Sequence, residues 1–230
     1  MRALAALVPL LLVASPRMTD AKCARMGMAP IVLTADVVVP AGGDGGIVIG
    51  TEQLGWDRKD LGQAEDTTWG FLTNLDLEQA KVTKLAPGLV VVAPRAAGKG
   101  TRELGGGSVK ATLRWGTDKV APLAAPEVTS ITHKRELGRR GGFNGRTVVT
   151  LAGDPPAGAV ALVLADGKGK ARSYGVPEGR EVVVFQTRAC APMPDGTIES
   201  KVGDKVVVRW VDKHGRLSSP SAPFTVAAAR

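Results

Sequence analysis

The residues best able to do acid-base or metal chemistry are few in this chain of 230 residues, which has two histidines and two cysteines. His133 and His214 each stand apart from any cysteine, so the sequence does not indicate a zinc site built from histidine and cysteine. His214 falls in an Asp-Lys-His-Gly stretch, which is typical of an exposed turn. A serine nucleophile motif, Gly-x-Ser-x-Gly, is not found either. We therefore predict no catalytic residue, no metal and no cofactor.

A glycine-rich stretch, Gly-Lys-Gly-Thr at residues 98–101, invites comparison with a phosphate-binding loop. That loop needs a distal glycine where this chain has Ala93, and Ser or Thr directly after the lysine, where it has Gly100. An exposed hairpin loop over residues 96–107 explains the stretch more simply.

Carboxylate pairs offer a different chemistry. Two such pairs, Glu65 with Asp66 and Asp57 with Asp60, lie in a polar stretch of the first half. Paired carboxylates hydrolyse glycosidic bonds when they face each other across a cleft. Polar loop residues are also expected in such a stretch, so a hydrolase stays an alternative interpretation.

The clearest surface signal is a basic run at residues 133–140, between two predicted strands. Its candidate anion-binding residues are Lys134, Arg135, Arg139 and Arg140. The second half holds the charge excess, with 16 basic and 10 acidic side chains over residues 126–230 against 12 and 11 over residues 22–125. Such a loop can bind an anionic cell-surface polymer, or it can simply be solvated. Nucleic acid is the weakest partner candidate, because no aromatic residue is interleaved with the run.

Residues 1–21 have the layout of a secretory signal peptide, with Arg2, an apolar run over residues 3–14 and a short polar end. The run is shorter than the ~20 residues that a helix needs to cross a bilayer, so we predict no transmembrane segment. A core helix is the alternative interpretation of this run. We expect cleavage after Ala21 and export to the periplasm or the extracellular space.

Export makes the only two cysteines, Cys23 and Cys190, candidates for a disulfide. A bond between them would close a loop of 167 residues. The chain-entropy model gives a loop of this length about 5 kcal/mol of stabilisation. Two free thiols are the open alternative, because Cys23 lies near the mature N-terminus.

Short valine-rich runs closed by glycine, proline or polar residues predict many strands and turns. The predicted strands are residues 31–39, 47–50, 67–73, 80–85, 89–93, 109–115, 127–132, 146–152, 159–165, 181–186, 205–211 and 224–227. Residues 75–79 are expected to form one helical turn. We predict an all-β fold of two tandem antiparallel β-sandwich domains after the signal peptide. An arm at residues 22–30 precedes the domains, which cover residues 31–122 and 126–230.

Three short matches relate the two halves. Trp115 and Trp210 each end an alternating strand pattern in Arg-Trp, residues 46–49 match residues 146–149, and residues 90–92 match residues 182–184. The offset of about 95 residues suits a sandwich domain. An internal duplication explains the matches, and so does coincidence between valine-rich segments.

The stretch VVVRWVDKHGRLSSPSAPFTV at residues 206–226 resembles the last hairpin of bacterial immunoglobulin-like and fibronectin type III-like domains. In those domains a strand ends in an Asp-x-x-Gly turn, and a Ser/Pro-rich return leads to the closing strand. The rest of residues 126–230 is similar only in strand spacing. The resemblance implies a sandwich fold and no particular activity. The chain departs from the immunoglobulin pattern in having no Cys-Trp-Cys spacing.

These patterns together predict an exported, non-enzymatic interaction or structural protein of the cell envelope or extracellular space. Aromatic residues are 4% of the chain, fewer than an aromatic-lined carbohydrate or peptide groove usually needs. The expected partner is a protein or an anionic cell-surface polymer. The alternatives are an anionic-polymer binding module that uses residues 133–140 and a hydrolase that uses loop carboxylates.

Overall fold

The computed structural model describes residues 28–34, 36–40, 45–53, 80–95, 98–106, 109–117, 119–137, 143–187 and 196–229. Within these ranges the chain forms strands and no helix, which confirms the predicted all-β class. None of the described residues belongs to a helix that is long and apolar enough to cross a membrane. The predicted signal peptide, both cysteines, residues 67–73 and 75–79 and the four loop carboxylates lie outside the described residues.

The first half of the chain forms two sheets. Sheet A has the order β1 (Met28–Val32), β3 (Ile47–Gln53), β5 (Leu89–Pro94) and β4 (Ala80–Ala86). Sheet B has the order β2 (Asp36–Val39), β7 (Val109–Trp115) and β6 (Thr101–Gly106). All pairs in these two sheets are antiparallel except β2 with β7, which run parallel.

The second half also forms two sheets. Sheet C has the order β12 (Glu181–Thr187), β9 (Phe143–Leu151), β8 (Val128–Leu137) and β15 (Ala227–Ala228). Sheet D has the order β11 (Ala171–Gly175), β10 (Ala159–Asp166), β13 (Lys205–Asp212) and β14 (Phe224–Thr225). The closing strand changes sheets at the buried Val226, so β14 pairs with β13 and β15 runs parallel to β8.

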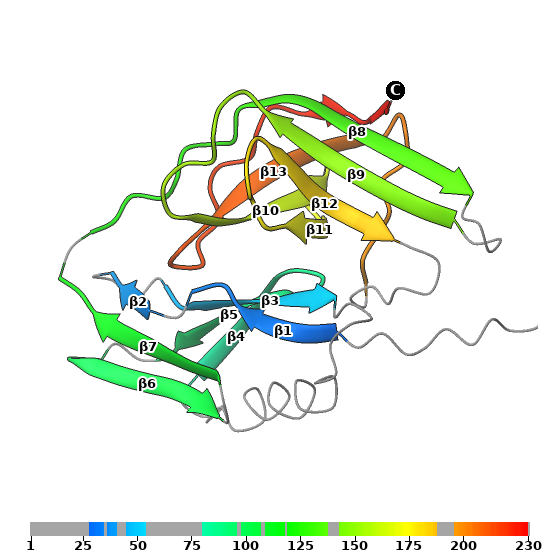
Figure 1. Cartoon of the computed structure of the whole chain (residues 1–230). Helices are drawn as coiled ribbons and strands as arrows, with labels where there is room; N and C mark the ends of the chain where they lie inside the picture. The colour runs from blue at the N-terminus through cyan, green and yellow to red at the C-terminus, as the bar shows by residue number, and fades with distance from the viewer. Residues whose placement is uncertain are drawn as a thin grey trace, which may run out of the picture.

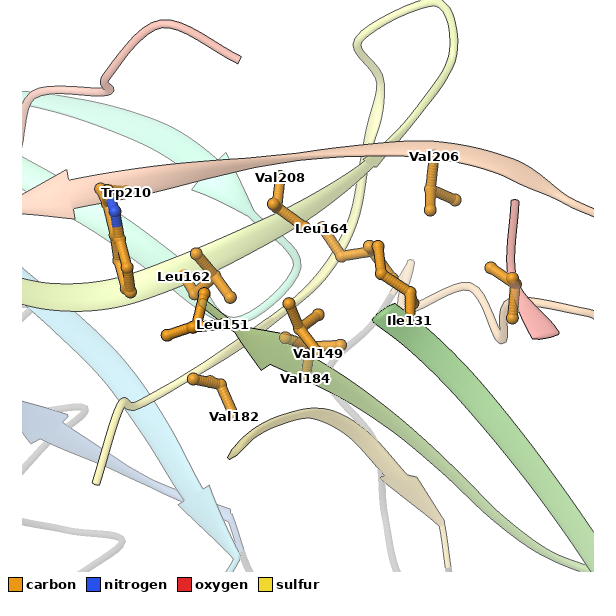
Figure 2. Packing of buried hydrophobic residues seen from close by; sticks show 11 residues of the cluster. Ile131, Val149, Leu151, Leu162, Leu164, Val182, Val184, Val206, Val208 and Trp210 are labelled. Carbon is orange, nitrogen blue, oxygen red and sulfur yellow. The ribbon is translucent and has the colours of Figure 1, made fainter. Parts of the chain in front are cut away.

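Sheets C and D pack face to face over an apolar cluster that is shown in Figure 2. Sheet D contributes alternate residues of β13, which are Val206, Val208 and Trp210, and alternate residues of β10. Sheets A and B enclose a second cluster that includes Ile47 and Leu113. Strand alternation explains both clusters, because every second side chain points to the same face. Each half is therefore sandwich-like.

A third apolar cluster joins the two halves, between the outer faces of sheets A and D. Successive residues of one strand enter different clusters: Val91 faces sheet D, and Val92 faces sheet B. In β10, Val163 faces sheet A and Leu164 faces sheet C. Strands that are buried on both faces need apolar residues at every position, which accounts for their unbroken runs. The four sheets therefore stack in the order B, A, D, C (Figure 1).

A tyrosine hydroxyl also joins the inner sheets. The Tyr174 hydroxyl of β11 donates a hydrogen bond to the Thr51 carbonyl of β3 at 2.9 Å. The same hydroxyl accepts one from the Thr51 N–H at 2.5 Å. By the register of β3 with β5, the residue opposite Thr51 would be Gly88, which lies in the β4–β5 turn. Tyr174 therefore occupies the place where a further residue of β5 would pair.

Most predicted strands in the described ranges are present, but several details are wrong, and the predicted strand 224–227 is two short strands in different sheets. The predicted strand 31–39 is two strands, and the first begins at Met28, inside the predicted arm. Residues 101–106 form β6 rather than an exposed loop, because each pairs with a residue of β7. Strand β11 was not predicted. The strand predicted at residues 127–132 continues to Leu137.

The three matches between the halves fall on different kinds of position. Residues 47–49 and 146–149 lie in β3 and β9, which each pair with the first strand of their half and with a later strand. Residues 90–92 and 182–184 lie in β5 and β12, which are those later strands. Trp115 lies in β7, between β2 and β6, and Trp210 lies in β13, between β10 and β14. The two strands differ in pairing, because β7 is parallel to β2 whereas β13 is antiparallel to both neighbours, and the duplication stays a prediction.

Candidate functional site

The predicted basic run lies at the end of the β8–β9 hairpin, which extends beyond the neighbouring strands at one side of the molecule (Figure 1). Residues 133–137 belong to β8, because each pairs with a residue of β9 as far as Leu137 opposite Phe143. The predicted loop is therefore wrong for these residues. Charged side chains on both faces remove the apolar alternation that would have indicated a strand. Arg139 and Arg140 lie outside the described residues.

One face of the hairpin end combines a cation with exposed apolar side chains. The Arg135 guanidinium carbon lies 4.3 Å from the centroid of the Phe143 ring. Leu137, directly opposite Phe143, is 71% exposed, and Phe143 is 53% exposed. A cation–π contact of this kind contributes about 0.5–1 kcal/mol at an exposed site. The contact holds Arg135 beside an apolar pair that the core does not cover.

The other face of the hairpin end carries Lys134, because successive residues of a strand point to opposite faces. Lys134 lies directly opposite Arg146 of β9, and like charges in that position repel each other. The Glu136 carboxylate forms an ion pair with the Lys134 ammonium group at 2.5 Å. This carboxylate offsets one of the two positive charges. The face therefore keeps a net positive charge that an anionic partner would neutralise.

His133, the first residue of the predicted run, is buried rather than exposed. Its Nε2 lies 3.2 Å from Glu199 Oε1, and its Nδ1 shares a hydrogen bond with the Thr147 hydroxyl at 2.9 Å. A hydroxyl, an imidazole and a carboxylate in a row is the order of a nucleophilic triad. Here the Thr147 side chain is fully buried, so no substrate reaches the hydroxyl. The contacts join β8 to β9 and to Glu199.

His214 is also buried, and the prediction of an exposed turn histidine is wrong. Its Nδ1 donates a hydrogen bond to the Val38 carbonyl at 2.7 Å, and its own carbonyl accepts one from Gly46 N–H at 2.8 Å. The Asp-x-x-Gly turn itself is present, because Gly215 N–H donates to the Asp212 carbonyl. The turn is buried since the first half of the chain covers it. His214 Nε2 has no hydrogen-bond partner among the described residues.

Arg216 ties the same turn to the segment between the halves. Its guanidinium donates two hydrogen bonds to the buried Asp212 carboxylate and others to the carbonyls of Val120 and Ala121. The Asp212 carboxylate also accepts the backbone N–H groups of His214 and Arg216. The charges of Arg216 and Asp212 therefore neutralise each other inside the molecule.

A cleft of about 710 Å³ opens beside this turn, where the two halves meet. Most of its lining residues come from β4 and β5 and from residues 214–216. Among the described residues, the side chains that line it are either apolar, such as Leu85 and Val91, or basic or neutral polar, such as Lys81 and Thr83, and none of them is a carboxylate. Sequence reasoning missed this site, because its residues lie in separate stretches that only the packing of sheet A on sheet D brings together.

The described part of the chain holds no group of three or more His, Cys, Asp or Glu residues that could bind a metal ion. Comparison of the chain with protein-family models, with curated proteins and with solved structures gave no match. The described part of the chain offers two candidate sites, the end of the β8–β9 hairpin and the cleft between the halves.

Proposed function

We propose that this protein is an exported, non-enzymatic interaction module of the cell envelope or extracellular space, and that the end of its β8–β9 hairpin binds an anionic surface polymer. The observation that carries the proposal is the stacking of Arg135 on the exposed Phe143 ring, next to the exposed Leu137. Exposed aromatic and arginine side chains are the residue types that dominate binding energy at interfaces.

The choice of an anionic partner rests on charge. Lys134 and Arg146 face each other on one side of the hairpin end, and Arg135 lies on the other side. A polymer with closely spaced anionic groups would relieve the repulsion between Lys134 and Arg146 while it pairs with both. The attraction is long-range at low salt and is screened at high salt, so binding should weaken steeply as salt is added.

We also propose that residues 126–230 form an immunoglobulin-like or fibronectin type III-like domain. The strand order supports this: one sheet holds the first, second and fifth strands of the half, and the other holds the third, fourth and sixth. The closing strand reaches both sheets. Related sandwich architectures are common in cell-surface domains, although a fold alone does not define a function.

Heparin binding tests the proposed contact surface. Lys134→Ala/Arg135→Ala removes two charges from the hairpin end, and Lys168→Ala/Lys170→Ala removes two exposed charges from the β10–β11 turn as a matched control. At about 1 kcal/mol for each cation at an anionic surface, the first double variant should bind heparin roughly 30-fold more weakly. It should also elute from a heparin column at lower NaCl than the control pair.

Equal losses in the two double variants would mean that net charge alone causes retention, and would overturn the proposal. Failure of the wild-type protein to bind heparin would overturn it as well. Arg139→Ala/Arg140→Ala then tests whether the other two predicted residues add to the same surface, in which case retention falls further.

A further inference from the structure

The cleft between the halves has the size of a small-molecule site. Its volume of about 710 Å³ falls within the range of ligand pockets, roughly 300–1,000 Å³, and such pockets often lie where domains meet. None of the described lining residues of the cleft belongs to the β8–β9 hairpin. An inference about it is therefore independent of the proposed function.

The charge of the cleft selects the kind of ligand. Lys81 lies on β4, and its side chain is on the same face of the sheet as those of Thr83 and Leu85, because every second residue of a strand faces the same side. Arg216 also lines the cleft, but its charge is neutralised by Asp212. Lys81 has no ion-pair partner among the described residues. Because the described lining residues are basic, neutral polar or apolar and include no carboxylate, the cleft favours a negatively charged ligand.

An unpartnered polar atom strengthens the inference. His214 is only 3% exposed and lines the cleft, and its Nε2 has no partner among the residues that the structure describes. Buried polar atoms are nearly always hydrogen-bonded, and one that is not calls for an explanation. Because Nδ1 donates to the Val38 carbonyl, the neutral imidazole of His214 presents Nε2 as a hydrogen-bond acceptor. An O–H group of a ligand, such as the P–OH of a singly ionised phosphate ester, can donate to this acceptor.

Most of the other lining residues are apolar, and Arg95 adds a further basic side chain. The apolar residues include Leu85 on β4, Val91 on β5 and Pro94 at the end of β5. We propose that this cleft binds a small anionic amphiphile, in which a phosphate, sulfonate or carboxylate group joins a short apolar chain. The anionic group lies toward Lys81 and the chain lies against Leu85 and Val91.

Calorimetry with octyl phosphate tests the proposal on the full chain, below the micelle concentration of the probe. One molecule of octyl phosphate should bind per chain, inorganic phosphate should bind at least tenfold more weakly, and octyltrimethylammonium should not bind. Lys81→Glu should weaken binding at least tenfold, and Thr83→Trp, which fills the cleft, should abolish it. Lys84→Glu is the matched control, because Lys84 is on the same strand and does not line the cleft.

Equal effects of Lys81→Glu and Lys84→Glu would overturn the proposal, and so would equal binding of the anionic and cationic octyl probes. A free ligand and a membrane lipid share the proposed chemistry, and a second arm separates these sources. If the wild-type protein sediments together with phosphatidylglycerol vesicles and the Lys81→Glu variant does not, the natural ligand is a membrane lipid. Binding of octyl phosphate without binding to vesicles would identify a free ligand. Binding of neither would end the proposal.

Discussion

Replacing Tyr174 with phenylalanine removes the hydroxyl that joins sheets A and D and keeps the aromatic ring. Two hydrogen bonds to the main chain of Thr51 are lost. Strand β5 begins at Leu89, so it offers no residue to take over these bonds. Leaving a buried backbone group without a partner costs about 1–3 kcal/mol. For the N–H and the carbonyl of this half-buried residue, we expect a total loss of about 2–4 kcal/mol.

Urea unfolding at neutral pH, followed by tryptophan fluorescence, measures this loss. With a slope of about 2 kcal/mol per molar urea, the midpoint should fall by about 1–2 M. Thr51→Val is the control, because it keeps the main-chain groups and removes only a hydroxyl 3.4 Å from its two neighbours. It should cost less than about 1 kcal/mol. An unchanged midpoint for Tyr174→Phe would refute the idea that this hydroxyl stabilises the contact between the sheets.

The wild-type protein and the Tyr174→Phe variant should also differ in how their stability depends on pH. Burial raises the pKa of the Tyr174 hydroxyl above its ordinary value of 10.0, and this effect exceeds the lowering by its contacts with Thr51. The folded state then holds the proton more tightly than the unfolded chain. The stabilisation is complete below about pH 10 and is lost as the pH rises through the folded-state pKa. The stability difference between wild type and Tyr174→Phe should therefore stay constant at neutral pH and shrink above about pH 10.

The turn over residues 212–216, which lies beside the cleft, gives two more predictions, each measured by urea unfolding. Gly215→Ala should cost about 2–4 kcal/mol, because φ is +80° and the new Cβ would lie 2.7 Å from both Val91 methyl carbons. Gly100→Ala, at φ +79° in open space, should cost only about 1 kcal/mol, and equal losses would contradict this explanation. Arg216→Ala should cost about 3–5 kcal/mol by leaving the Asp212 carboxylate buried and unpaired. Adding Asp212→Asn should recover part of that loss.

Three of the predicted strands have sequences that also indicate how deeply the strands are buried. Residues 47–49, 89–92 and 161–165 are apolar at every position. Their runs predict strands, but they also indicate burial on both faces. In the structure, β3, β5 and β10 each contribute to two apolar clusters, a burial on both faces that we did not predict. The pairing of sheet A with sheet D was not predictable, because it depends on which two faces meet.

The histidines show why the local sequence failed at the candidate site. His214 is covered through Val38, which is 176 residues away in the chain, and His133 contacts Glu199. Turn-forming and charged neighbours predict exposure, and they say nothing about a distant segment that packs on top. Strand β6 was missed for a different reason. Its glycines indicate a loop, and only its pairing with β7 shows that they lie in a strand.

The cluster between sheets A and D limits how far either half can be treated as a portable module. Cutting the chain at residues 120–126 would uncover Val48, Leu89 and Val91 on one piece and Val163 and Val211 on the other. Uncovered apolar faces of this kind are prone to association and aggregation. In a chain of independently folding domains, one domain can be moved into another protein without exposing an apolar face. Here each half completes the surface of the other, so the unit that can be transplanted, shuffled or fused is the whole stack of four sheets.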